Sequence, residues 1–159
     1  NIDPTRDAIH HLLLQNVVTG CTMMINRPLA KLVETIPEEA IMHDWWIAMV
    51  ASCFGKIGFI DEPLMLYRQH SSNDTGAKHY SFGYFMQRFT QKQSFKKYTS
   101  QAKVFGEVYD ELLDAKTRVL LKDFSKIDTM GWFERRMFLL KWGILKNGLV
   151  RNAGLMWKV

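Results

Sequence analysis

Apolar residues recur along the N-terminal part of this chain with the spacing of an amphipathic helix. Such a helix places apolar side chains three and four positions apart, whereas a half-buried strand alternates them with polar ones. Residues 4–15 follow the helical spacing, at Ile9, Leu12 and Leu13. Asp3 precedes this run and is a residue type that caps helices, so a first helix is predicted over 4–15.

Two further helices are predicted before residue 56. Pro28 suits the first turn of a helix, where its missing N–H costs nothing, and it predicts a helix through about Val33. Residues 44–54 are apolar at almost every position, which is typical of a helix buried on most of its sides. Gly55 follows directly and predicts its end.

Short apolar runs bounded by turn residues predict strands between these helices. Residues 17–25, 58–60 and 64–67 have this character, and Gly20 interrupts the first run. An Asp-Glu-Pro turn at 61–63 separates the other two. The expected fold class is therefore α+β and rich in helix.

The second half of the chain predicts helices almost throughout. Residues 101–122 give the clearest apolar stripe, at Val104, Val108, Leu112, Ala115 and Val119. Asp114 and Arg118 are spaced as a stabilising i,i+4 pair on that helix. Residues 132–157 are also predicted to be helical, although their apolar residues scatter and glycines interrupt them. The expected division is a mixed α/β part over 1–78 and a helical extension over 79–159.

Composition is that of one globular domain or part of one: 159 residues, of which 47% are hydrophobic and 23% charged. The chain begins with Asn1 instead of Met, and the start of a helix is predicted only a few residues later. It is therefore expected to be part of a longer protein. Its two cysteines, Cys21 and Cys53, lack a disulfide or zinc-site spacing and fit a reducing, cytoplasmic location. No apolar run reaches the roughly 18 residues of a membrane span, so membrane contact is expected to be peripheral.

Charge divides unevenly along the chain. Residues 1–76 hold five Lys and Arg against nine Asp and Glu, whereas 77–159 hold sixteen against seven. Such a basic half suits anionic lipid at the inner face of a membrane, nucleic acid, or plain solvent. Interleaved aromatic and basic residues near the end favour the lipid interface, namely Trp132, Arg135, Arg136, Lys141, Trp142, Lys146, Arg151 and Trp157.

Asp44 is the first candidate for chemistry. A carboxylate in the first turn of a helix lies at the positive end of the helix dipole, which favours its charged form. It can then accept a proton from a hydroxyl as that hydroxyl attacks a carbon. The alternative role is that of a helix cap.

A second cluster follows the predicted strand at 64–67, in the run Y-R-Q-H-S-S-N. Arg68 offers a planar fork for two phosphate oxygens, and His70 could bind a divalent cation or donate to a phosphate. Asn73 could orient the loop. These residues could equally be ordinary surface groups.

A third cluster is the run T-G-C-T-M-M-I-N-R from Thr19. Gly20 allows close approach of the backbone to a ligand, although many such glycines only form a turn. Trp45 and Trp46 are suited to stacking on a sugar, and one of the two is expected in the core.

Taken in chain order, the run from Thr19, the run H-D-W-W at 43–46 and the run D-E-P-L-M-L-Y-R-Q-H-S-S-N-D-T-G at 61–76 resemble the second half of a bacterial family 2 glycosyltransferase of the polysaccharide or rhamnosyltransferase-like kind. The resemblance covers about 10–80 of the chain. It implies the C-terminal part of a GT-A domain, with short strands near 17–25, 58–60 and 64–67. It also implies an inverting transfer from a nucleotide-sugar donor to a polysaccharide or lipid-linked acceptor, with a divalent metal, Mg or Mn.

The resemblance assigns roles residue by residue. Asp44 corresponds to the general base, Arg68 to a diphosphate ligand and His70 to a metal ligand. The sugar and acceptor pocket would include Thr19, Gly20, His43, Trp45 and Asn73. The family's nucleotide-binding half and its Asp-x-Asp metal motif have no counterpart here, so this chain alone is expected to be inactive and not to retain the metal.

A half-fold would also leave apolar faces and strand edges unpaired, which predicts a homo-oligomer. The alternative function is a basic helical interaction module that binds nucleic acid or a protein partner. The chain has no zinc finger or RNP-type fingerprint, so nucleic acid is not an expected partner under the favoured interpretation.

Overall fold

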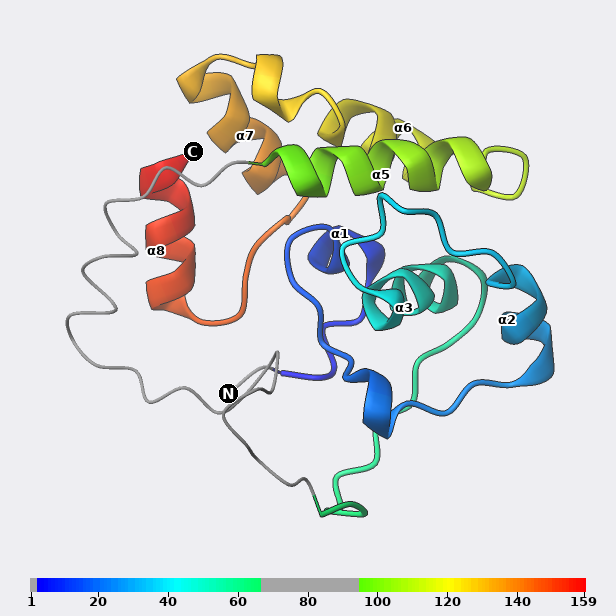
Figure 1. Ribbon diagram of the computed structural model, residues 1–159. Coiled ribbons are helices and arrows are strands. Elements are labelled where there is room, and N and C mark those ends of the chain that lie inside the picture. Colours follow the sequence, from blue (N-terminus) through cyan, green and yellow to red (C-terminus); the bar gives the residue numbers. More distant parts are fainter. Residues whose placement is uncertain (1–2, 67–94) are drawn as a thin grey trace.

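The computed structural model describes residues 3–66 and 95–159. Within those ranges the regular structure is entirely helical (Figure 1). The elements are α1 (Ile9–Leu12), the 3-10 turn η1 (Gly20–Thr22), α2 (Arg27–Leu32), α3 (His43–Phe54), α5 (Lys96–Val108), α6 (Ala115–Phe124), the 3-10 turn η2 (Ile127–Thr129), α7 (Trp132–Lys141) and α8 (Leu149–Lys158).

The expectation of an α+β fold with GT-A strands is wrong for the described residues, where no strand forms. Of the predicted strands, 17–25 contains the η1 turn instead, and 58–60 is irregular. The third, 64–67, is irregular over 64–66, and its last residue lies outside the described residues. Phe59, Ile60, Leu64 and Leu66 in the latter two runs are exposed to solvent. A strand is stable only when a neighbour pairs with its N–H and C=O groups, and no other described segment pairs with these.

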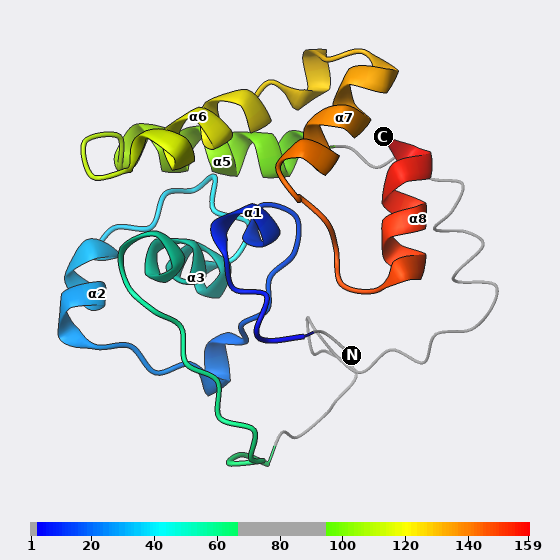
Figure 2. The same ribbon diagram turned by 180° about the vertical axis from the view of Figure 1, so that it is seen from behind.

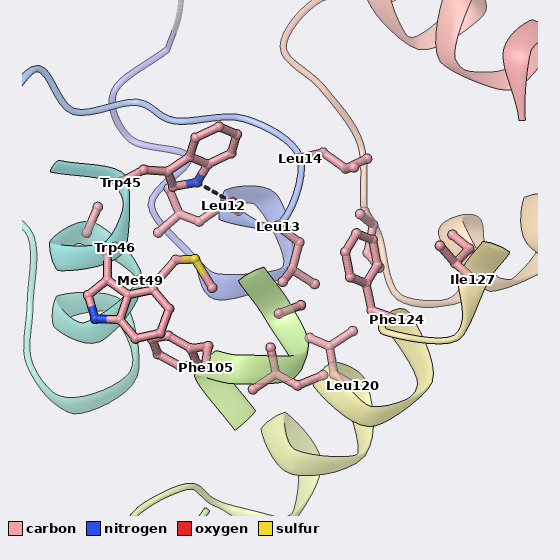
Figure 3. Close-up of a cluster of buried hydrophobic side chains, with 14 of the residues drawn as sticks. Leu12, Leu13, Leu14, Trp45, Trp46, Met49, Phe105, Leu120, Phe124 and Ile127 are labelled. Atoms are coloured by element: carbon pink, nitrogen blue, oxygen red, sulfur yellow. Dashed lines mark hydrogen bonds between the residues drawn. The ribbon is translucent and has the colours of Figure 1, made fainter. Parts of the chain in front are cut away.

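The predicted helix over residues 44–54 is confirmed as α3, and it forms the centre of the core. Eight successive residues from Asp44 to Ala51 are buried. The indole of Trp45 donates to the carbonyl oxygen of Leu12 at 2.6 Å, which fastens α3 to α1 (Figure 3). Trp46 packs edge-on against Phe105 of α5, with ring centroids 5.1 Å apart.

Helices α5 and α6 form an antiparallel hairpin that lies along one side of α3 in both views (Figure 2). A single stripe over 101–122 was the expectation, and it is wrong, because α5 ends at Val108. Asp114 then caps α6 by accepting from the N–H groups of Lys116 and Thr117. Arg118 pairs with Asp110 at 2.9 Å instead of with Asp114. The stripe residues Val108, Leu112 and Val119 are exposed, and Leu120, Leu121 and Phe124 are buried in their place.

The C-terminal part contains two helices separated by glycines. Gly143 and Gly148 have φ angles of +63° and +88°, a region that other residues rarely adopt. They reverse the chain between α7 and α8, so the last helix stands apart from the α5–α6 hairpin (Figure 1).

The N-terminal helix is shorter than its predicted range of 4–15, because only Ile9–Leu12 are helical. Asp3 does not cap it. Its carboxylate accepts from the N–H and hydroxyl of Thr5 in a local turn. The helix near Pro28 is confirmed as α2, which Asn26 caps by accepting from the N–H of Leu29 at 3.0 Å.

Candidate functional site

Two of the three motifs meet at the N-terminus of α3. The carboxylate of Asp44 accepts from the backbone N–H of Gly20 at 2.9 Å and from the side-chain amide of Asn16 at 3.1 Å. The amide oxygen of Asn16 in turn accepts from the N–H of Val18 at 2.9 Å, which fixes the direction of the amide. Residues far apart in sequence therefore hold this carboxylate in one orientation.

Asp44 does not serve as the cap of its own helix. Met42 occupies the cap position of α3, and no side chain there accepts a hydrogen bond. The carboxylate is directed at the Gly20 turn instead, although the side chain lies in the first turn of α3. The aspartate is only 3% exposed, and the described residues provide no ion-pair partner for it. Burial of a carboxylate is costly unless hydrogen bonds stabilise it, and Asn16 and Gly20 donate those hydrogen bonds.

Gly20 and His43 touch at this junction. A Cβ atom built on Gly20 would lie 2.7 Å from Nε2 of His43, closer than real contacts allow. The absence of a side chain at residue 20 therefore lets the turn approach both His43 and Asp44. Thr19 and His43 are exposed, so the rim of the junction is polar and open to solvent.

Trp45 lies in a different environment from its neighbour His43. Its ring is 7% exposed, packs edge-on against Tyr98, and has its N–H occupied by Leu12. In this structure the side chain is part of the core, and it has no free face for stacking on a sugar.

Gln101, which was not predicted from the sequence, holds the loop that leads into α3. Its amide is 1% exposed; its oxygen accepts from the N–H of Ile41 at 2.8 Å, and its nitrogen donates to the sulfur of Met49 at 3.3 Å. The hydroxyl of Tyr109 donates to the carbonyl oxygen of Leu32 at 2.8 Å. Helix α5 thus anchors the loop between α2 and α3 at both ends. A single buried amide has no recognisable spacing in a sequence, which explains why Gln101 was not found.

Three predicted site residues, Arg68, His70 and Asn73, lie outside the described residues. Within 3–66 and 95–159, no group of three His, Cys, Asp or Glu side chains is placed to hold a metal ion. The described residues alone thus supply no ligand set for Mg or Mn. Both cysteines are free, and burial raises the pKa of Cys53 to about 12.

A separate concavity of about 500 Å³ opens between α1, α6 and α7. None of the residues predicted to form the site lines it. Its walls include His10, Lys116, Lys141 and Trp142. Burial and then the charges of Arg6 and Lys116 lower the pKa of His10.

Next to it, His11 accepts from the guanidinium of Arg6 at 2.9 Å. Burial, then His10 and Arg6, lower the pKa of His11 to about 4. Arg6 also donates to the carbonyl oxygens of Leu145 and Lys146, at 3.3 and 3.0 Å. This cluster joins the N-terminal segment to the linker that leads into α8.

Comparisons of this chain with models of known protein families, with curated proteins and with solved structures found no match. The described helices are too short or too polar for any of them to cross a membrane.

Proposed function

We propose that this chain carries the acceptor side of an inverting glycosyltransferase, in which Asp44 is the general base. The observation that carries the proposal is the hydrogen bond from the Gly20 N–H to the Asp44 carboxylate, because it joins two of the three motifs of the resemblance. The proposal concerns this site and its chemistry, and it requires no strand in the described residues.

The chemistry follows from the orientation of the carboxylate. Each of its oxygens accepts one hydrogen bond from the protein, at 2.9 and 3.1 Å, and each retains a further lone pair. An acceptor hydroxyl that reaches the junction would give its proton to Asp44 as its oxygen attacks the anomeric carbon. The new C–O bond forms opposite the bond to the nucleoside diphosphate, which breaks, so the configuration inverts.

The neighbouring groups have distinct roles in this proposal. Asn16 and the Gly20 N–H hold the carboxylate in one orientation. Thr19 and His43 lie exposed at the rim, where they are placed to contact the acceptor. Arg68 would bind the leaving diphosphate, and His70 would contribute to holding the divalent metal, which would neutralise that charge.

Asp44→Asn tests the proposal in the complete polypeptide that carries this chain. An amide of the same shape can still accept from the Gly20 N–H, but it is too weak a base to take the proton. We expect kcat to fall by about 10² to 10⁴, since positioned proton transfer contributes about that much. Circular dichroism and the melting temperature would show that the fold remains.

Asn16→Ala is the matched control, because it removes one of the two hydrogen bonds and leaves the carboxylate. Its kcat should fall far less than that of Asp44→Asn. Near wild-type transfer by Asp44→Asn, or equal losses in both variants, would make Asp44 a structural tether and not a base.

A further inference from the structure

Helix α7 is apolar on two opposite sides. Phe138 and Leu139 face the core and are buried. The opposite side carries three large apolar side chains that are exposed, namely Phe133, Met137 and Leu140, and Trp132 at the start of the helix is exposed as well. An amphipathic surface helix normally turns its polar side to solvent, so the outward side of α7 is atypical.

Helix α8 repeats this arrangement. Leu155 and Val159 are buried against the rest of the protein. The other side presents Leu149, Val150 and Trp157, which are 89%, 59% and 78% exposed. Large exposed apolar surfaces of this kind mark interaction sites.

Arg136 ties the two helices together at this surface. Its guanidinium donates to the carbonyl oxygens of Trp132 and Val159, at 2.6 and 2.7 Å, and lies 3.6 Å from the centre of the Trp132 ring. The end of α8 is thereby fixed to the first turns of α7. The exposed apolar side chains of the two helices are together called the α7–α8 face.

The segment that carries the α7–α8 face is strongly basic in sequence. Residues 132–159 contain six Lys and Arg and a single acidic residue, Glu134. The Glu134 carboxylate accepts from the N–H of Gly131 at the start of α7. The complementary partner is therefore anionic and also has an apolar interior that can receive leucine, valine and methionine side chains.

We propose that the α7–α8 face binds the surface of an anionic lipid bilayer, independently of the proposed transfer reaction. Tryptophan and arginine suit the headgroup level, and the aliphatic side chains reach the acyl chains below it. Nucleic acid satisfies the charge but offers no place for the aliphatic residues. Each helix has ten residues and is about 15 Å long, half the thickness of the hydrocarbon core, so the helices lie along the surface.

Vesicle cosedimentation of the complete polypeptide tests this proposal with a double variant. Phe133→Ser with Leu149→Ser removes two exposed apolar side chains from the face. Binding to phosphatidylcholine vesicles with about 30% phosphatidylserine should weaken at least tenfold. The unmodified protein should bind pure phosphatidylcholine at least about tenfold less tightly and lose affinity as salt is raised.

The matched control is Val108→Ser with Leu112→Ser. These residues are also exposed and apolar, but they lie where α5 turns into α6, at the end of α5 away from α8 (Figures 1 and 2). Vesicle binding by this control should equal that of the unmodified protein. Equal binding by both double variants would overturn the proposal, as would equal affinity for neutral vesicles.

Two other outcomes would assign the face to a different partner and thus refute the lipid proposal. One is that the unmodified protein does not bind vesicles but forms a dimer in sedimentation experiments, and that the Phe133→Ser, Leu149→Ser variant is a monomer. The other is salt-sensitive binding to a DNA or RNA oligonucleotide that the same variant weakens.

Discussion

Helices α3 and α8 are both rich in apolar residues, and the protein uses them in opposite ways. In α3 the residues from Asp44 to Ala51 are buried on every side of the helix. In α8 the core takes only Leu155 and the adjoining Val159, and Leu149, Val150 and Trp157 face solvent. Apolar content alone therefore does not make a core helix, because burial requires a partner on each apolar side. The helix that is fully enclosed holds the candidate base, and the half-enclosed one provides the candidate docking face.

The largest expected difference in stability is between two variants that each lack one tryptophan side chain, one in α3 and one in α8. Trp46 is fully buried against Phe105, so Trp46→Ala should lower the free energy of unfolding by about 3 to 5 kcal/mol. Trp157 is mostly exposed, and Trp157→Ala should change the free energy of unfolding by no more than about 0.5 kcal/mol. Urea denaturation of both variants measures the difference. Similar losses in the two would show that α8 is as enclosed as α3.

A smaller loss of stability is expected when the contact between α5 and the loop that leads into α3 is removed. Gln101→Leu keeps the size of the side chain but leaves the N–H of Ile41 without its acceptor. The unfolding free energy should fall by about 1 to 3 kcal/mol, the usual cost of a lost partner for an enclosed polar group. A Gln101→Leu protein as stable as the original would mean that another acceptor replaces the amide.

The smallest effect concerns the link between the two regions at His11. Its pKa is about 4 in the folded protein, below the ordinary 6.5, so the unfolded chain binds more protons between these values. Stability should therefore decrease as the pH falls from 6.5 to 4, by about 1 kcal/mol at this partly exposed site. Melting temperatures across that range should decline less steeply for His11→Gln. Identical slopes in the two proteins would contradict this assignment.

Parts of the fold were predictable because local sequence determined them. Helix α3 followed from an almost unbroken apolar run ended by Gly55, and α2 followed from Pro28. The break between Val108 and Ala115 was missed because the apolar stripe continued through it, although Asp114 caps the new helix. The strands were wrong because residues such as Phe59 and Leu64 are suited to strands only when a neighbour pairs with them.

The candidate site was predictable to a similar extent. Asp44 and Gly20 were identified from motif resemblance, and the structure brings them together. Asn16 and Gln101 were missed, since a lone amide that orients another residue leaves no spacing pattern. The outward sides of α7 and α8 were anticipated only as a mixture of basic and aromatic residues; which side is exposed depends on tertiary packing.

The most direct test of the central claim is a crystal structure of the complete polypeptide with its acceptor saccharide bound. The account predicts that one acceptor hydroxyl lies within about 3 Å of an Asp44 carboxylate oxygen, beside Gly20 and His43. An acceptor bound elsewhere, with Asp44 still enclosed by Asn16 and Gly20 and no hydroxyl within reach, would contradict it.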